Sequence, residues 1–75
     1  MKGIHMETEW YELPIRVIRN GVDMIIPANQ VQKGDYVFFM GMKRICDGMI
    51  PDDEEEIIYI KFGIDLWPAE MCNSK

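Results

Sequence analysis

One plan is used twice in this chain of 75 residues, and that repeat limits the possible folds more than any other feature. Residues 15–31 and 57–72 each contain an alternating apolar run, a glycine, a second apolar run and the dipeptide Pro-Ala. Proline cannot donate to the hydrogen-bond ladder of a sheet, so we expect each second run to end there. An apolar residue follows in each copy, and we expect these two, Val31 and Met71, to be buried as equivalent anchors. The repeat therefore predicts two similar hairpins, each folded back onto a shared core.

The two copies differ by one residue between an aspartate and the proline. Because a one-residue change turns the side chains of a strand to the other face, we expect a β-bulge near Ile25 in the first copy. Asp23 and Asp65 occupy matching places in this alignment. They could form a site of paired carboxylates, or each could accept a hydrogen bond from a backbone N–H in its own turn. The second role is common for aspartate in turns, and we favour it.

Turn residues divide the rest of the chain into short strands. Asn20-Gly21 is typical of a hairpin turn, because both residues tolerate positive φ. Gly34-Asp35 predicts another turn, and residues 57–62 alternate as a strand does. The predicted fold is all-β: a small closed barrel of five to six short antiparallel strands, since closure removes exposed strand edges.

The domain prediction follows from the same pattern. Residues 13–75 are expected to form the barrel domain, and residues 1–12 an irregular arm. The letters "IHM" at residues 4–6 are typical of an expression-vector remnant, which leaves open whether residues 1–5 are native or the natural chain starts at Met6. No apolar run approaches the ~18 residues of a membrane span, and the arm lacks the apolar centre of a signal peptide. We therefore expect a cytoplasmic protein with no membrane partner.

The turn and strand pattern resembles that of small SH3-like and Hint-like barrels found in bacterial and phage proteins. The resemblance covers residues 15–72 and rests on an Ala-x-x-Val-x-x-Gly-Asp-x-Val turn, followed by a strand, a glycine, a strand and Pro-Ala. Hint domains that splice themselves need a nucleophilic Cys or Ser at their start and a block of histidines. This chain has only Cys46, Cys72 and a single histidine, His5. The resemblance therefore implies a fold and no activity.

Few residues could carry out catalysis or hold a cofactor. An active site needs a nucleophile, or a tuned acid and base, placed together, and the one histidine lies in the arm. Cys46 and Cys72 lack metal-ligand spacing, and free buried thiols are favoured over a disulfide between them. The acids at residues 52–56 lack the spacing and the glycine of a calcium loop. We therefore expect no enzymatic activity, no metal and no cofactor.

The acidic run is the first candidate binding site. The net charge is −5, and five adjacent acids at residues 52–56 equal that excess. Like charges repel, so the run is expected to be an exposed loop, yet nothing in folding requires the acids to be clustered. The aromatic pair in the arm could cover the open end of the barrel or anchor a partner. The predicted partner-binding residues are Asp52, Asp53, Glu54, Glu55, Glu56, Trp10 and Tyr11.

These residues predict a non-enzymatic protein-binding module, an accessory or inhibitory protein of a phage or mobile element that acts on a host protein through an acidic surface. The charge favours a basic host enzyme that handles nucleic acid as the partner. The first alternative is a small nucleic-acid-binding barrel, with Tyr36, Phe38 or Tyr59 stacking on bases. The second is a virion structural or self-associating component. The cationic face of the first alternative consists of Arg16, Arg19, Lys43 and Arg44.

Overall fold

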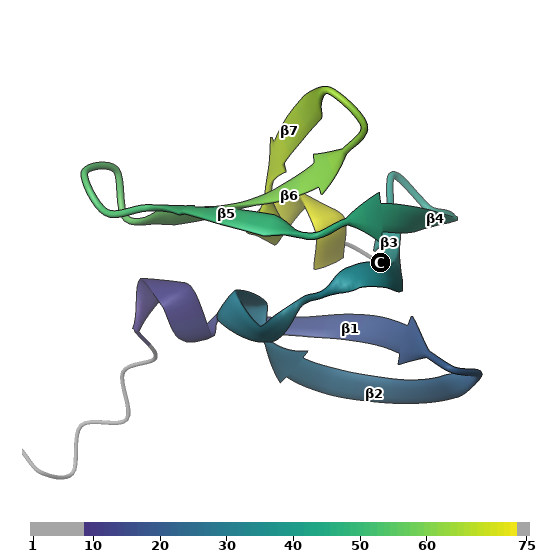
Figure 1. Cartoon of the computed structure of the whole chain (residues 1–75). Coiled ribbons are helices and arrows are strands. Elements are labelled where there is room, and N and C mark those ends of the chain that lie inside the picture. The colour runs from purple at the N-terminus through teal and green to yellow at the C-terminus, as the bar shows by residue number, and fades with distance from the viewer. Residues whose placement is uncertain (1–8, 74–75) are drawn as a thin grey trace, which may run out of the picture.

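The structure, a computed structural model, describes residues 9–73 and confirms the all-β class (Figure 1). Alternating burial shows why these segments become strands: in β6 every second side chain is buried and those between are half-exposed. The strands are β1 (Pro14–Arg19), β2 (Val22–Pro27), β3 (Lys33–Phe39), β4 (Met42–Asp47), β5 (Met49–Asp52), β6 (Ile57–Phe62) and β7 (Asp65–Pro68). The short 3-10 helices are η1 (Trp10–Glu12), η2 (Ala28–Gln30) and η3 (Ala69–Asn73).

The strands form two antiparallel sheets. Sheet A has the order β2-β1-β3-β4, and sheet B has the order β5-β6-β7. The chain passes from sheet A to sheet B at Gly48, between β4 and β5. Within residues 9–73 no strand pairing joins the two sheets, so the closure into one barrel that the sequence predicted is not detected.

Seven strands occur among the described residues, and the prediction of five to six was wrong. Met40 and Gly41 both have positive φ (53° and 79°), which makes a tight turn between β3 and β4. β5 forms in a segment that we expected to be loop. It tolerates Pro51 because β5 lies at the edge of sheet B, where a missing N–H need not leave a gap in the ladder.

The β-bulge predicted near Ile25 is also wrong. β1 and β2 pair along their whole length without a register shift. The shift lies instead between Lys33 and Tyr36, in the pairing of β3 with β4. The length difference between the two copies arises from their turns: the first hairpin turns at residues 20–21 and the second at residues 63–64.

One core lies between the two sheets, and both 3-10 helices that follow the Pro-Ala dipeptides contribute to it. Val31 is buried at 4% exposure, as predicted, but Met71 is 43% exposed, so the prediction for Met71 was wrong. The equivalent anchor is Cys72, which is fully buried. Each anchor lies three residues after a buried alanine, a spacing of one 3-10 turn. The largest fully buried apolar side chains are Ile15, Ile58, Ile60, Val17 and Val37.

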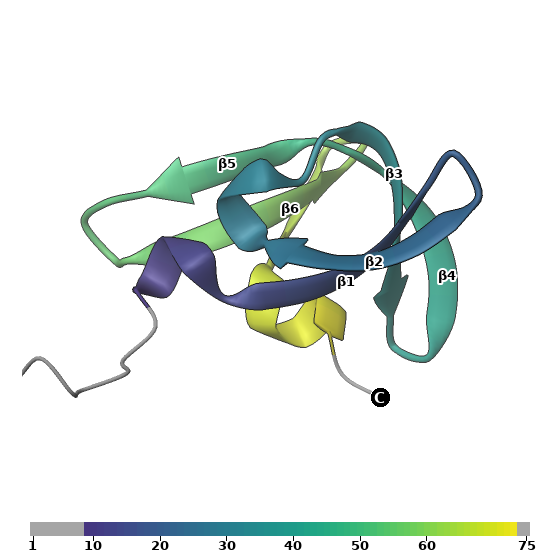
Figure 2. The ribbon, with the colours of Figure 1, turned by 90° about the horizontal axis from the view of Figure 1, so that it is seen from below.

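Different turns lie at the two ends of the molecule. The turn between β5 and β6 lies at the same end as η1, and the turns between β1 and β2 and between β3 and β4 lie at the other end (Figures 1 and 2). Of the predicted arm, residues 9–12 include η1, whose Trp10 and Tyr11 pack against the core. Residues 1–8 lie outside the described part of the chain.

Candidate functional site

The acidic run forms an ordered hairpin turn between β5 and β6. Asp52 pairs with Ile57 at the last position of the ladder, and its Oδ1 accepts hydrogen bonds from the backbone N–H groups of Glu54 (3.0 Å) and Glu55 (3.1 Å). Glu56 ends the turn with a φ of 58°. The Tyr59 hydroxyl donates to the Glu55 carboxylate (3.2 Å), which raises the pKa of Tyr59. The turn therefore presents a fixed set of exposed carboxylates at one end of the molecule.

An open pocket of about 190 Å³ lies beside this turn. η1, the segment leading into β1, the start of β6 and the start of η3 each contribute to its wall. Its apolar lining includes side chains that are buried or half-buried, whereas the two carboxylates on it are exposed. We call it the Trp10 pocket; its lining residues are Trp10, Leu13, Ile57, Ile58, Ala69, Glu56 and Glu70.

The two aromatic residues of η1 are held in place by each other and by the core. Trp10 and Tyr11 are both half-buried, and their rings meet edge to face, with centroids 5.3 Å apart and planes at 88°. This geometry is a preferred arrangement for aromatic pairs. Trp10 thus packs against the core and also forms one wall of the pocket.

The predicted cationic face is divided by the structure. Arg16 and Lys43 lie on the outer side of sheet A, where the Arg16 guanidinium is 4.5 Å from the Phe38 ring centroid and the Lys43 ammonium is 5.3 Å from that of Tyr36. The Asp23 carboxylate accepts hydrogen bonds from Arg16 Nε (3.0 and 3.2 Å) and Nη2, which lowers the pKa of Asp23. Arg19 and Arg44 point to the other side of the sheet, as the burial pattern of their strands and the register require.

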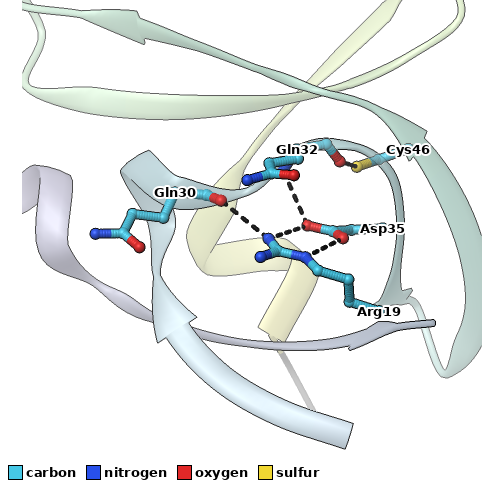
Figure 3. Close-up of polar contacts among 5 residues, drawn as sticks. All are labelled: Arg19, Gln30, Gln32, Asp35 and Cys46. Atoms are coloured by element: carbon cyan, nitrogen blue, oxygen red, sulfur yellow. Dashed lines mark hydrogen bonds and ion pairs between the residues drawn. The ribbon is translucent and has the colours of Figure 1, made fainter. Parts of the chain in front are cut away.

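Arg19 forms an ion pair with Asp35, the one buried charged residue in the described part of the chain. Asp35, 2% exposed, accepts from Arg19 Nε and Nη2, both at 2.8 Å, and from the backbone N–H of Gln32 at 2.8 Å (Figure 3). Arg19 also donates to the Gln30 carbonyl (3.1 Å). The hydrogen bonds from Arg19 lower the pKa of Asp35. This cluster ties β1 to η2 and to β3, and it engages the Arg19 guanidinium.

Arg44 lies against an aromatic cluster at the margin of the core. Its guanidinium is 5.0 Å from the Phe62 centroid and 5.8 Å from that of Phe39. The Phe39 ring in turn lies 5.5 Å from Phe62 and 4.9 Å from Trp67. These contacts join β4 to sheet B. The position of Arg44 is therefore explained by packing between the sheets.

The predicted turn roles of the aspartates hold only in part. The Asp35 N–H donates to the Gln32 carbonyl (3.1 Å) and the Asp35 carboxylate accepts from the Gln32 N–H, so a turn forms at Gly34-Asp35 as predicted, although β3 already begins at Lys33. Asp23 instead accepts from a side chain on the neighbouring strand, so its predicted role was wrong. Asp23 pairs with Ile18 in sheet A and Asp65 pairs with Phe62 in sheet B, so the structure does not bring the two carboxylates into one strand pair.

The remaining candidates for chemistry lie apart. Cys46 and Cys72 are free and buried. Burial raises the pKa of both thiols, that of Cys72 to about 11, which keeps them protonated near neutral pH. Among residues 9–73, no three His, Cys, Asp or Glu side chains lie together in a way that could hold a metal ion. His5 lies outside the described residues.

Comparison with protein-family models, with curated proteins and with solved structures finds no match for this chain. In the part of the chain that the structure describes, no helix is long and apolar enough to cross a membrane.

Sequence reasoning named the acidic run and Trp10 as separate candidates for partner binding and missed the rest of the pocket. Glu70 lies near the C-terminal end of the described chain, and only the fold brings it into the same pocket as Glu56. Leu13 and Ala69 looked like ordinary core residues in the sequence. Their proximity to an acidic turn depends on how η1 and η3 pack, which no local pattern encodes.

Proposed function

We propose that this protein is a non-enzymatic protein-binding module that takes a basic segment of its partner into the Trp10 pocket. The proposal rests on one observation: Trp10 and Glu56 line the same pocket. Two separate parts of the sequence that were candidates for partner binding thus share one surface. An aromatic wall beside charged groups is typical of an anchor site for a partner side chain.

The size and lining of the pocket favour a single side chain as its occupant. Sites for drug-sized ligands usually enclose ~300–1,000 Å³, and this pocket has about 190 Å³. Its apolar wall suits the hydrocarbon stem of an arginine or lysine. The Glu56 and Glu70 carboxylates suit the cationic head of that side chain, and a Trp face attracts cations as well.

The acidic turn extends this charge beyond the pocket. Carboxylates clustered on one end of a molecule attract positively charged partners and speed their association, an effect that salt weakens. A partner with a basic surface, such as a host enzyme that handles nucleic acid, fits this charge. An accessory or inhibitory protein of a phage or mobile element, acting in the cytoplasm, is the biological role that we infer.

We also infer that the chain path is a variant of the small SH3-like barrel. Two short antiparallel sheets enclose one core, and a 3-10 turn follows each Pro-Ala dipeptide. Such scaffolds commonly place binding residues on their connecting turns, as the acidic turn and η1 are placed here.

A pull-down from bacterial lysate tests the proposal. Three samples are immobilised: the unchanged protein, a pocket variant and a turn variant. The pocket variant carries Glu56→Gln and Glu70→Gln. The turn variant carries Asp53→Asn and Glu54→Gln. Asp52 and Glu55 stay unchanged because they accept hydrogen bonds within the hairpin. We expect the unchanged chain to retain a basic protein and to release it at high salt. The pocket variant should retain about tenfold less of that protein, or lower still.

The matched control is Asp65→Asn, which removes a carboxylate from an exposed position outside the pocket. This variant should retain the partner at the level of the unchanged chain. Circular dichroism checks that each variant is folded. Equal retention by the unchanged chain and the pocket variant, at low and high salt, would rule out the Trp10 pocket as the binding site.

A further inference from the structure

The outer side of sheet A carries a surface that the proposed function does not use. In β1, Ile15 and Val17 are fully buried, so Arg16 and Ile18 between and after them point away from the core. Ile18 pairs with Tyr36 of β3, which places Tyr36 on the same side. The outer face, as we call it, is built on Arg16, Ile18, Ile25, Tyr36, Phe38 and Lys43.

Two aromatic rings lie next to each other on this face. Tyr36 and Phe38 are two residues apart on β3, a central strand of sheet A, which separates them by ~7 Å along the strand. Tyr36 is 39% exposed and Phe38 is half-buried. Rings held at this spacing on an open sheet can each stack on one base of an extended single strand.

Each ring has a cation over one of its faces. The Arg16 guanidinium lies 4.5 Å from the Phe38 centroid, on the β1 side, and the Lys43 ammonium lies 5.3 Å from the Tyr36 centroid, on the β4 side. Stacking platforms for single strands combine such rings with cations that contact phosphates. The face therefore supplies rings for base stacking and cations for phosphate contacts, with one cation on each side of β3.

The charge of the molecule is separated in a way that suits an anionic ligand here. Strand alternation places two acids on this side of the sheet: Asp23, whose carboxylate is held by Arg16, and Asp47, whose carboxylate accepts from the backbone N–H of Gly63. Residues 14–47 carry five basic and three acidic residues, whereas residues 48–73 carry one basic and seven acidic. The acidic turn lies at the end of the molecule away from the β1–β2 and β3–β4 turns (Figures 1 and 2).

Exposed apolar side chains lie on the same face as the rings. Ile25 is 70% exposed and Ile45, which pairs with Tyr36, is 55% exposed. Apolar surface of this kind contacts base edges and sugars, and a duplex would hide the base faces that the rings need. We propose that the outer face of sheet A binds single-stranded nucleic acid, with Tyr36 and Phe38 stacking on bases and Arg16 and Lys43 contacting phosphates.

Fluorescence anisotropy with a labelled single-stranded oligothymidylate tests this proposal. We expect saturable binding at low salt, with a salt dependence that corresponds to two phosphate contacts, a slope of about −1.4 in log affinity against log salt. Lys43→Gln should reduce the magnitude of that slope by about 0.7. Tyr36→Leu keeps apolar area but removes the ring, and it should weaken binding about tenfold or more.

Two controls separate this site from others. Lys61→Gln removes one positive charge from sheet B and should leave binding within about twofold of the unchanged chain. The Glu56→Gln and Glu70→Gln variant should also bind the oligonucleotide without loss, and Tyr36→Leu should still retain the protein partner. Failure of one proposal therefore leaves the other standing.

Three results would overturn the proposal. The first is no saturable binding at low salt, and the second is equal binding by the unchanged chain and Tyr36→Leu. The third is a concentration-dependent dimer in sedimentation experiments that Ile45→Lys breaks, because the outer face would then be covered by a second copy of this chain.

Discussion

The β1–β2 hairpin and the β6–β7 hairpin have the same core positions but different turns and different polar contacts. In the first, Ile15 pairs with Ile26, one position inside the pair that contains the terminal proline of β2. In the second, Ile60 pairs with Trp67 at the corresponding position. Ile15 and Ile60 are both fully buried. The repeat in the sequence is therefore a repeat of core positions.

The turns of the two hairpins explain why their glycines do not correspond. In the first turn, Asn20 and Gly21 both have positive φ (53° and 79°), as a type I′ turn requires. In the second, Gly63 (φ 64°) comes first and Ile64 second. The paired part of the second hairpin is two residues shorter, and an even difference keeps the side chains on their faces.

Aligning the copies at glycine therefore misplaces the aspartates. Measured from the prolines, the residue that corresponds to Asp65 is Met24, and Asp23 corresponds to the turn residue Ile64. Asp23 and Asp65 looked equivalent in the sequence, yet they have different neighbours. The comparison teaches that a repeat in a β protein is best aligned at its strand ends, where burial constrains the register.

The polar contacts of the hairpins differ as well. The first is tied to the rest of sheet A by the Arg19–Asp35 ion pair, in which Asp35 is buried. The second is held at its turn by Asp47, whose carboxylate accepts a hydrogen bond from the backbone N–H of Gly63 (2.6 Å). The core of the two hairpins is thus similar, but only the first includes a buried charge.

The largest expected effect concerns the equivalent isoleucines. Ile15→Ala and Ile60→Ala each remove a fully buried side chain and leave a cavity, which should lower the free energy of unfolding by about 2–5 kcal/mol. Urea denaturation measures both. If one substitution costs less than about 1 kcal/mol, the two positions are not equivalent and the comparison fails.

Next in size is the loss of the buried charge beside the first hairpin. Asp35→Asn leaves Arg19 without its charged partner and should cost about 2–3 kcal/mol, below the usual range for a fully buried pair because Arg19 is partly exposed. Asp65→Asn is the control at an exposed carboxylate and should change stability little. A cost for Asp35→Asn no larger than that for Asp65→Asn would contradict the importance of the ion pair.

The same carboxylate predicts a dependence on pH. The pKa of Asp35 lies below its ordinary value of 3.8 in the folded state, mainly because Arg19 donates to its carboxylate. Its contribution is therefore fully present above that ordinary value and is lost as pH falls through the folded pKa. Denaturation midpoints measured between neutral pH and about pH 2 should fall less in Asp35→Asn than in the unchanged chain. Parallel curves would show that another group dominates.

The smallest expected effect separates the true anchors from the false one. Val31→Ala removes a buried side chain and should cost about 2 kcal/mol, whereas Met71→Ala, at 43% exposure, should cost less than about 1 kcal/mol. Thermal unfolding of the two variants measures the difference. A larger cost for Met71→Ala would restore Met71 as the partner of Val31 in the repeat.

Local patterns predicted much of the fold. Alternation located the strand at residues 57–62, and Asn20-Gly21 correctly predicted the turn of the first hairpin. β5 was missed because its short run ends in Pro51 and Asp52, residues that disfavour strands unless an edge position accepts them.

The sequence predicted which residues are candidates for binding, but it did not predict which of them lie together on one surface. The sequence identified Arg16, Arg19, Lys43 and Arg44 as cations, but strand register decided that two of them share a face. Alternation along β1 places Arg19 on the opposite side from Arg16, where it pairs with Asp35, a residue 16 positions away in the chain. Such pairing depends on which strands become neighbours, and the order of strands in a sheet has no local signal.

The sequence by itself determined the all-β class, the two proline-ended hairpins and the exposed acidic turn, because backbone conformation and alternating burial are set by near neighbours in the chain. The tertiary structure alone decided that Glu70 and Glu56 line one pocket, that Cys72 and not Met71 is the anchor, and that Tyr36 and Lys43 share an open face. Those outcomes depend on how two sheets pack around one core. A change of one residue in the length of a turn alters which side chains come into contact.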